Sequence, residues 1–291
     1  DQLPVAFIVG MVFMVSGIAF KISAAPFHMW TPDVYEGSPS SSTFFFAVVP
    51  KLAIFVLLIR IFHASFFEHI TKWRYYLVVI AVLTIIVGSF GGLEQKKLKS
   101  LLAYSSISHM GYTLVAFSAG TFEGMQILFC YLLLYMVAGL CIWSIFLVLQ
   151  LKHKYVKKQN KDLAELTSLS KSNNILALFF STVLLSVGGL PPMVGFLVKI
   201  GIFLASIEAT MYLVAIVSIL CSVISTFYYI RITKTMYFEG SVAGKLYYPI
   251  KPHTSILIVC LFYFLLFLFI NPTLVYTIAH KIVLLLTVTM V

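Results

Sequence analysis

Long apolar stretches separated by short polar segments dominate the chain from its first residues to its last. A helix that crosses the hydrocarbon core of a bilayer needs about 20 apolar residues. The pattern therefore predicts eight membrane spans, at approximately 4–29, 42–63, 73–92, 98–119, 123–150, 174–207, 209–236 and 254–271. We expect residues 1–271 to form a single helical bundle. The tail 272–291 is apolar but interrupted by His280 and Lys281, and is expected to lie along the membrane surface.

Two of the predicted spans are interrupted by proline and glycine. The first span carries Pro26 shortly after Lys21, and the sixth contains the segment 188–192, Gly-Gly-Leu-Pro-Pro. Irregular backbone at membrane depth is tolerated only inside protein or beside a water-filled cavity. Broken helices in the two halves of a bundle mark the ion sites of transporters, although an ordinary proline kink is the alternative. The predicted fold is an all-α membrane bundle of about eight helices, two of them broken.

The composition excludes a soluble globular enzyme, because only 10% of the residues are charged and 61% are hydrophobic. Soluble domains carry roughly 25% charged residues. The four cysteines lie in apolar stretches without metal-binding spacing, and no nucleotide, haem or iron–sulfur motif is present. We therefore expect neither a metal nor a redox cofactor in this chain. The net charge of +10 is attributed to one side of a membrane and not to nucleic-acid binding.

The basic residues divide between the two membrane sides very unequally. Loops 30–41, 93–97, 151–173 and 237–253 share one side. With their flanks they hold Lys96, Lys97, Lys99, Lys152, Lys154, Lys157, Lys158, Lys161, Lys171, Arg231, Lys234, Lys245 and Lys251. The other side has Arg60, Lys72, Arg74 and Lys281. By the positive-inside rule the first side faces the cytoplasm or matrix, and both chain ends then lie on the opposite side.

Three lysines, Lys21, Lys51 and Lys199, fall inside predicted spans. A charge at mid-bilayer costs about 2.5–3.5 kcal/mol on insertion scales, so such residues usually have a function. Snorkelling to the interface fails for Lys51, which follows Pro50 near the middle of its span, but remains an alternative for Lys21. A buried lysine can be tuned to bind and release a proton. No acidic residue lies deep in any span, so these lysines lack a carboxylate partner.

The fourth span carries a polar stripe on one helical face. Its members, at three- and four-residue spacing, are Leu101, Ser105, Ser108, His109 and Tyr112. A lone histidine in a membrane helix is most often a packing residue, but His109 within this stripe is better interpreted as part of a hydrated proton relay. His28, just past the first break, would connect the same route to the inner side.

Three sequence motifs carry a resemblance to a known family. They are residues 17–39 with Lys21, Pro26 and His28, residues 99–112 with His109, and residues 189–199 with Lys199. Together they resemble the signatures of the antiporter-like proton-pumping subunits of respiratory complex I, NADH:ubiquinone oxidoreductase. The resemblance extends from the first residues to about residue 236.

The resemblance implies a function for the lysines and histidines in and near the predicted spans. Lys21 and Lys51 would belong to the inner half-channel and its centre, Lys199 to the outlet half-channel, and His28 and His109 to the axis between. The chain would translocate protons as a membrane-arm subunit of an NADH:ubiquinone reductase whose redox chemistry other subunits perform. Its partners would be the other membrane-arm subunits and the lipid bilayer. The alternatives are a cation/proton antiporter subunit of the same superfamily and a structural subunit that no longer pumps.

The family also carries helices upstream of the Lys21 helix, including a glutamate that tunes that lysine, and this sequence has no counterpart to them. We therefore expect either a separate polypeptide that supplies those helices or their loss. Usage rich in Phe, Tyr, Ile and Lys suits an AT-rich organelle genome, which favours the mitochondrial inner membrane. The Lys-rich loops would then face the matrix, and both termini the intermembrane space.

Overall fold

The computed structural model describes residues 5–152, 157–159, 162–167, 169–239 and 250–288. Its helices are α1 (Val5–Ile22), α2 (Trp30–Gly37), α3 (Ser40–Ile59), α4 (Ile70–Gly91), α5 (Leu98–Ala119), α6 (Phe122–Val148), α7 (Leu169–Ser172), α8 (Asn174–Gly188), α9 (Val194–Glu208), α10 (Tyr212–Tyr237), α11 (Pro252–Ile270) and α12 (Thr273–Val288). A π-helical turn covers Arg60–Ser65, and 3₁₀ turns cover Phe67–His69 and Leu163–Leu166. Strands β1 (Gln150–Lys152) and β2 (Lys157–Gln159) pair antiparallel.

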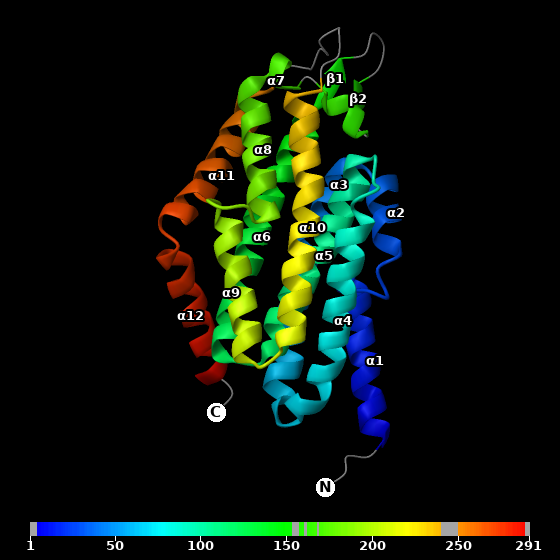
Figure 1. Cartoon of the computed structure of the whole chain (residues 1–291), viewed down its shortest axis with the longest axis vertical. Coiled ribbons are helices and arrows are strands. Elements are labelled where there is room, and N and C mark those ends of the chain that lie inside the picture. Colours follow the sequence, from blue (N-terminus) through cyan, green and yellow to red (C-terminus); the bar gives the residue numbers. More distant parts are fainter. Residues whose placement is uncertain (1–4, 153–156, 160–161, 168, 240–249, 289–291) are drawn as a thin grey trace.

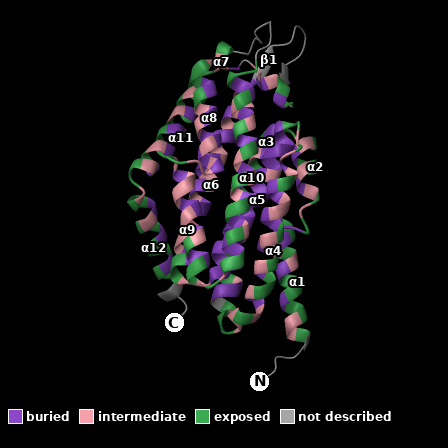
Figure 2. Cartoon of the chain, viewed as in Figure 1, coloured by how far each residue is buried: buried purple, intermediate pink, exposed green. Residues whose placement is uncertain are grey.

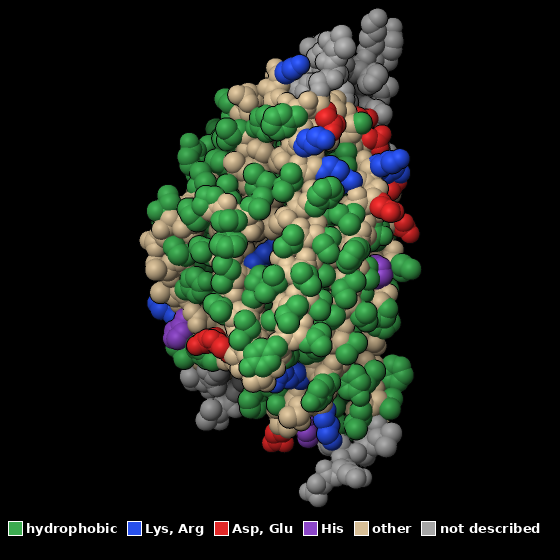
Figure 3. Space-filling model, in the orientation of Figure 1, with side chains coloured by type: hydrophobic (Ala, Val, Ile, Leu, Met, Phe, Trp, Pro, Cys, Tyr) green, Lys and Arg blue, Asp and Glu red, His purple; other side chains and the backbone are tan. Residues whose placement is uncertain are grey.

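The long helices run side by side along the long axis of the molecule (Figure 1). Within the described residues, five helical segments are long and apolar enough to cross a membrane: Ser40–His63, Phe67–Gly91, Phe122–Val148, Tyr212–Tyr237 and Pro252–Ile270. Hydrophobic side chains cover the middle of the face in Figure 3, and most charged ones lie toward its ends. The predicted all-α membrane bundle is confirmed.

Helix α5 forms the centre of the bundle. Every residue of α5 except Tyr104 is buried, including its serines and His109. The neighbouring helices turn their buried residues inward and leave apolar side chains exposed on their outer faces (Figure 2). A helix surrounded by protein can carry polar side chains that a lipid-facing helix cannot, because its neighbours can satisfy their hydrogen bonds. The polar stripe of the fourth predicted span is thereby explained.

The first helix break contains Pro26, as the sequence indicated, but the helices on either side of it differ from the predicted bounds. The prediction extended the span to residue 29 and placed a loop at 30–41, whereas α1 ends at Ile22 and α2 occupies Trp30–Gly37. The non-helical segment between them is fixed at two points. The Ala25 amide donates to Thr84 Oγ1 on α4 at 3.0 Å, and the Trp30 indole donates to the Phe20 carbonyl at 3.0 Å. In Figure 1, α2 lies beyond the end of α1, so the two are the halves of one interrupted helix.

The second break, between α8 and α9, lies where the sequence placed it. Gly189 has a left-handed backbone with φ of 80°, and its amide bonds to the Leu185 carbonyl at 3.1 Å, which ends α8. Helix α9 then starts so close to α8 that a Cβ on Gly195 would lie 1.9 Å from the Ser186 carbonyl oxygen. Only glycine allows that approach.

The predicted surface tail forms helix α12. It follows α11 after a break at Asn271 and Pro272, and the two helices lie one after the other along the same side of the bundle (Figure 1). Gln126 on α6 donates from Nε2 to the Tyr276 carbonyl of α12 at 3.3 Å. The position of α12 relative to the bilayer stays a prediction.

Candidate functional site

Three of the predicted site residues are buried in the core on three different helices. The relative exposure of Lys51 on α3 is 2%, that of His109 on α5 is 5%, and that of Lys199 on α9 is 4%. Burying an unpaired charge is costly, so the groups that contact these side chains decide what each can do.

Lys51 is held by neutral oxygen and aromatic groups. Its Nζ donates to Ser106 Oγ on α5 at 2.9 Å, and Ser106 in turn donates to the Ala103 carbonyl at 2.8 Å. The Nζ also lies 5.7 Å from the ring centroid of Tyr35 on α2. Lys51 thus connects the second half of the first broken helix to the central helix.

Lys199 takes its hydrogen-bond partner from the second helix break. Its Nζ donates to the Gly188 carbonyl at 2.6 Å, and lies 5.3 Å from the ring centroid of Tyr112 on α5. Gly188 is the last residue of α8, where carbonyl oxygens have no intrahelical donor and carry the negative end of the helix dipole. The break therefore places a partly negative oxygen against a buried ammonium. Among the described residues neither Lys51 nor Lys199 forms an ion pair.

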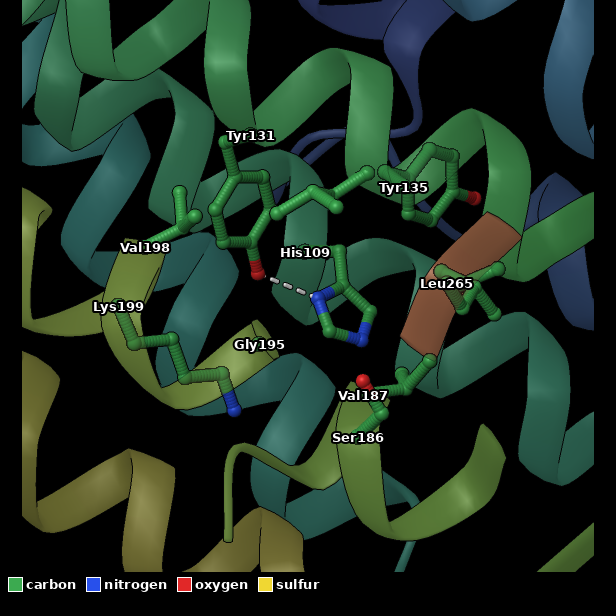
Figure 4. A pocket seen from close by; sticks show the side chains of 11 residues that line it. His109, Tyr131, Tyr135, Ser186, Val187, Gly195, Val198, Lys199 and Leu265 are labelled. Carbon is green, nitrogen blue, oxygen red and sulfur yellow. Dashed lines mark hydrogen bonds between the residues drawn. The ribbon is translucent and has the colours of Figure 1, made fainter. Parts of the chain in front are cut away.

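His109, on α5, lies between Lys51 of α3 and Lys199 of α9. Its Nδ1 lies 2.5 Å from the hydroxyl of Tyr131 on α6, and its Nε2 lies 3.1 Å from the hydroxyl of Tyr229 on α10. Figure 4 shows the imidazole facing the Tyr131 hydroxyl, with the Lys199 side chain pointing toward the same space. Both ring nitrogens thus have a hydroxyl partner that can donate or accept a proton.

Two small cavities meet at His109. One of about 40 Å³ is lined by His109, Tyr131, Ser186 and Lys199, among others. The second, of about 30 Å³, is lined by Ser105 as well as Ser106 and His109. A water molecule needs roughly 10–15 Å³ of such volume and two to four polar partners. Each cavity therefore has room for water, one on the Lys199 side of the imidazole and one on the side of the serine that binds Lys51.

Lys21 is not brought into this cluster, and the expectation that it is buried is wrong for the described residues. Lys21 is exposed on α1. Helix α1 lies at the edge of the bundle and buries the face that carries Met11, Val15 and Ala19. Lys21 follows Ala19 by two residues, which is about 200° around the helix, so it points away from the core.

His28 lies in the non-helical segment between α1 and α2 and is only partly buried. Its Nδ1 is buried and has no hydrogen-bond partner among the described residues. The structure therefore places His28 at the first break, as predicted, but away from the contacts that join Lys51, His109 and Lys199.

The sequence did not single out Tyr131, Tyr229 and Ser106, which contact the predicted residues directly. Ser106 is adjacent to the stripe on the fourth span, and its neighbour Ser105 was included. Tyr131 stands in a span that is otherwise almost entirely apolar. Its hydroxyl there was a usable signal, because a buried tyrosine hydroxyl needs a partner. No group of three or more His, Cys, Asp or Glu side chains that could hold a metal occurs in the described part of the chain.

Comparison with known sequences places this arrangement in a wider context. Residues 4–225 match the profile of the family described as NADH:quinone oxidoreductase/Mrp antiporter, TM. NADH-quinone oxidoreductase subunit N of Parvibaculum lavamentivorans is 38% identical over 94% of this chain and 55% of its own length. NADH-ubiquinone oxidoreductase chain 2 of Marchantia polymorpha is 39% identical over 94% of this chain and 54% of its own length. The chain thus spans about half the length of the curated relatives that it matches.

Chains of solved structures from the same kinds of complex have a similar fold. A chain of respiratory complex I from Thermus thermophilus matches with a TM-score of 0.81 and 29% identity, over 95% of this chain and 60% of that one. A chain of the Mrp complex from Dietzia sp. matches with a TM-score of 0.81 at 18% identity, over 94% of this chain and 58% of that one. The second likeness concerns the fold alone.

Proposed function

The chain belongs to the family of NADH:quinone oxidoreductase and Mrp antiporter membrane subunits, and from that membership we propose that it translocates protons as a membrane-arm subunit of respiratory complex I. Other subunits would carry out the NADH:ubiquinone chemistry, so the chain acts as part of an H⁺-translocating enzyme. The observation that carries the proposal is the placement of His109 between two buried lysines, with a water-sized cavity on each side.

The proposed proton route runs from Lys51 through Ser106 and the 30 Å³ cavity to His109, and then through the 40 Å³ cavity to Lys199. Each lysine is hydrogen-bonded to a neutral oxygen, and neither is paired with a carboxylate of the residues that the structure describes. Such partners stabilise an ammonium less than a carboxylate does, so that a buried lysine can also exist as the neutral amine. A group that is stable in both states can receive a proton and release it.

Lys21 and His28 would extend the route toward the inner side. Lys21 lies on the outward face of α1, together with exposed apolar residues such as Phe13 and Phe20. We propose that other membrane-arm helices cover this face and enclose Lys21. The expectation that these helices belong to a separate polypeptide stays a prediction, which the set of polypeptides that copurify with the chain will test.

We further propose the mitochondrial inner membrane as the location, with the Lys-rich end in the matrix. The composition and the likeness to chain 2 of Marchantia polymorpha support this location. The positive-inside rule supports the orientation.

The test of the proposed function is Lys51→Met in the assembled complex, with the proton-to-electron ratio measured in sealed vesicles. Methionine keeps the length and apolar stem of lysine but cannot bind a proton, so we expect a lower ratio. Lys281→Met is the matched control, since Lys281 is exposed on α12. An unchanged ratio in Lys51→Met would refute the proposed route and favour a structural subunit. Sodium or potassium exchange without NADH oxidation would favour the antiporter alternative, which the family description also includes.

A further inference from the structure

We propose that Tyr131 and Tyr229 are proton-relay residues that exchange protons with the two ring nitrogens of His109, Tyr131 at Nδ1 and Tyr229 at Nε2. The proposal rests on the proposed function and names how a proton crosses the imidazole. It assigns a role to two hydroxyl groups that stand on different helices, α6 and α10, and converge on the central helix α5.

The contacts of each hydroxyl give the relay its two sides. The Tyr131 side chain lines the same cavity as Lys199, and its hydroxyl lies 2.5 Å from His109 Nδ1. The Tyr229 hydroxyl lies 3.1 Å from Nε2. Each ring nitrogen of His109 therefore has its own tyrosine hydroxyl, and the one at Nδ1 belongs to a residue that shares a cavity with Lys199.

The number of hydrogen-bond donors and acceptors on the imidazole ring decides which hydroxyl donates to it and which accepts from it. A neutral imidazole has one N–H donor and one bare nitrogen acceptor, whereas the protonated ring has two donors. With a hydroxyl on each nitrogen of His109, one hydroxyl must donate to the neutral ring and the other must accept from it. The protonated ring makes both hydroxyls acceptors. The protonation state of His109 and the orientation of the two hydroxyls are therefore coupled.

A proton can cross the site in balanced steps. With the ring hydrogen on Nδ1, the Tyr229 oxygen accepts a proton from a hydronium ion, which becomes neutral water, and Tyr229 passes its own hydroxyl proton to Nε2. The imidazolium then releases the Nδ1 proton to the Tyr131 oxygen, and Tyr131 releases its original hydroxyl proton to water beside Lys199. One O–H or N–H bond forms for each that breaks, and each tyrosine ends as a neutral phenol. Rotation of the hydroxyls and of the imidazole restores the starting state.

The neighbouring Tyr135 packs on the same imidazole, but its hydroxyl forms no hydrogen bond with either ring nitrogen of His109. Its ring centroid lies 5.6 Å from that of His109, against 5.9 Å for Tyr131, so the two rings pack on the imidazole equally well. The Tyr135 hydroxyl, however, donates to the Ala47 carbonyl at 3.1 Å and points away from the imidazole (Figure 4). Ring packing alone therefore does not require the hydroxyl contacts that Tyr131 and Tyr229 form.

The experiment compares Tyr131→Phe, Tyr229→Phe and the control Tyr276→Phe in the assembled complex; Tyr276 lies on α12 and lines neither cavity at His109. Each change removes one hydroxyl and leaves the aromatic ring. We expect the coupled turnover rate to fall at least about tenfold in the first two variants, since a positioned proton donor contributes roughly 10²-fold or more to a transfer step and water can replace part of it. The solvent deuterium isotope effect should rise, because proton transfer becomes rate-limiting. Tyr276→Phe should change neither the turnover rate nor the isotope effect.

The possible outcomes distinguish the relay from the route on which it rests. His109→Leu serves as the test of the route itself. Wild-type turnover and isotope effect in Tyr131→Phe and Tyr229→Phe, together with lost pumping in His109→Leu, would overturn the relay and leave the route intact. Unchanged pumping in His109→Leu would overturn the route. An equal loss in all three phenylalanine variants, with an unchanged isotope effect, would indicate packing and would also overturn the relay.

Discussion

At the level of single residues, the notable feature is a buried lysine whose direct partners in the described part of the chain are neutral. Lys199 donates to the Gly188 carbonyl and lies over the Tyr112 ring. A structural lysine at this depth would be expected to have a carboxylate partner, because its charge must be compensated. The arrangement suits a residue that changes its protonation state and contributes little to the stability of the fold.

That interpretation predicts that Lys199→Met separates stability from function. We expect the free energy of unfolding to change by less than about 1 kcal/mol or to rise, because methionine has a similar volume and no charge to bury. Proton translocation should be lost. Thermal unfolding of the purified complex and vesicle acidification measure the two effects. A large drop in the melting temperature would mean that the lysine holds the break together.

The sequence predicted Lys51, His109 and Lys199 correctly as buried residues, because a charge or imidazole in an apolar span is visible without coordinates. It could not predict Lys21, since exposure depends on which face of α1 packs against the bundle. Nor could it join Tyr229 to His109, because those residues are 120 positions apart and meet only through the packing of α5 against α10.

At the scale of elements, the two helix breaks place the site. The two breaks were predictable from the prolines and glycines at these positions. The sixth predicted span, 174–207, is also too long for one uninterrupted membrane helix. The consequences of the breaks were not predictable, because they depend on contacts with other helices. The first break ends α1 seven residues before the predicted boundary and is anchored by Thr84 on α4. The second break frees the Gly188 carbonyl for Lys199.

The second break predicts a specific effect of Gly195→Ala. The added Cβ would lie 1.9 Å from the Ser186 carbonyl oxygen, which forces α9 away from α8. We expect a destabilisation of about 1–3 kcal/mol, as for other overpacked sites, and a loss of proton translocation because Lys199 moves with α9. In the control Gly10→Ala, the new Cβ meets no atom of the described residues within 4 Å. Thermal unfolding that is unchanged in Gly195→Ala would contradict the close approach.

The second half of the first broken helix is fastened to α5 by an ion pair at its end. Glu36 on α2 pairs with Lys97 and accepts from Ser100 Oγ at 3.0 Å, and Lys99 donates to the Ser38 carbonyl at 2.8 Å. We expect Glu36→Gln to speed hydrogen exchange of the α2 amides, with the exposed Glu94→Gln as the control. Equal exchange in both variants would show that α2 is held by packing alone.

The pH dependence of this contact follows from Lys97. Its hydrogen bond to Glu36 and the attraction of that carboxylate raise the pKa of Lys97 above its ordinary value. A raised folded-state pKa stabilises the contact fully below the unfolded value, near 10.4, and the contribution is lost as the pH rises through the folded value. Between pH 6 and 9 the α2 exchange rates, corrected for intrinsic exchange, should therefore show no titration of Lys97.

At the scale of the whole molecule, the start of α1 and the end of α12 lie at one end of the bundle, and the β1–β2 hairpin lies at the other (Figure 1). An even number of crossings, as the sequence predicted, gives this arrangement. The division of charge supports the proposed orientation, in which the hairpin end faces the matrix.

The orientation predicts which engineered cysteines react with a membrane-impermeant thiol reagent. Lys171→Cys, on α7 at the hairpin end, should react only from the matrix side. Lys72→Cys, near the start of α4 at the opposite end, should react only from the intermembrane space. If both cysteines reacted from the same side, the number of membrane crossings between Lys72 and Lys171 could not be odd. If Lys171→Cys reacted from the intermembrane space and Lys72→Cys from the matrix, the proposed orientation would be reversed.

If Lys51 and Lys199 belong to one proton route through His109, a double-mutant cycle of the two lysines will reveal it. Protons translocated per electron are measured in vesicles for Lys51→Met, Lys199→Met and the double variant. Residues that act as one unit are non-additive, so each single variant should lose as much translocation as the double variant does. Additive losses from the two single variants, or wild-type translocation in either one, would contradict a single route.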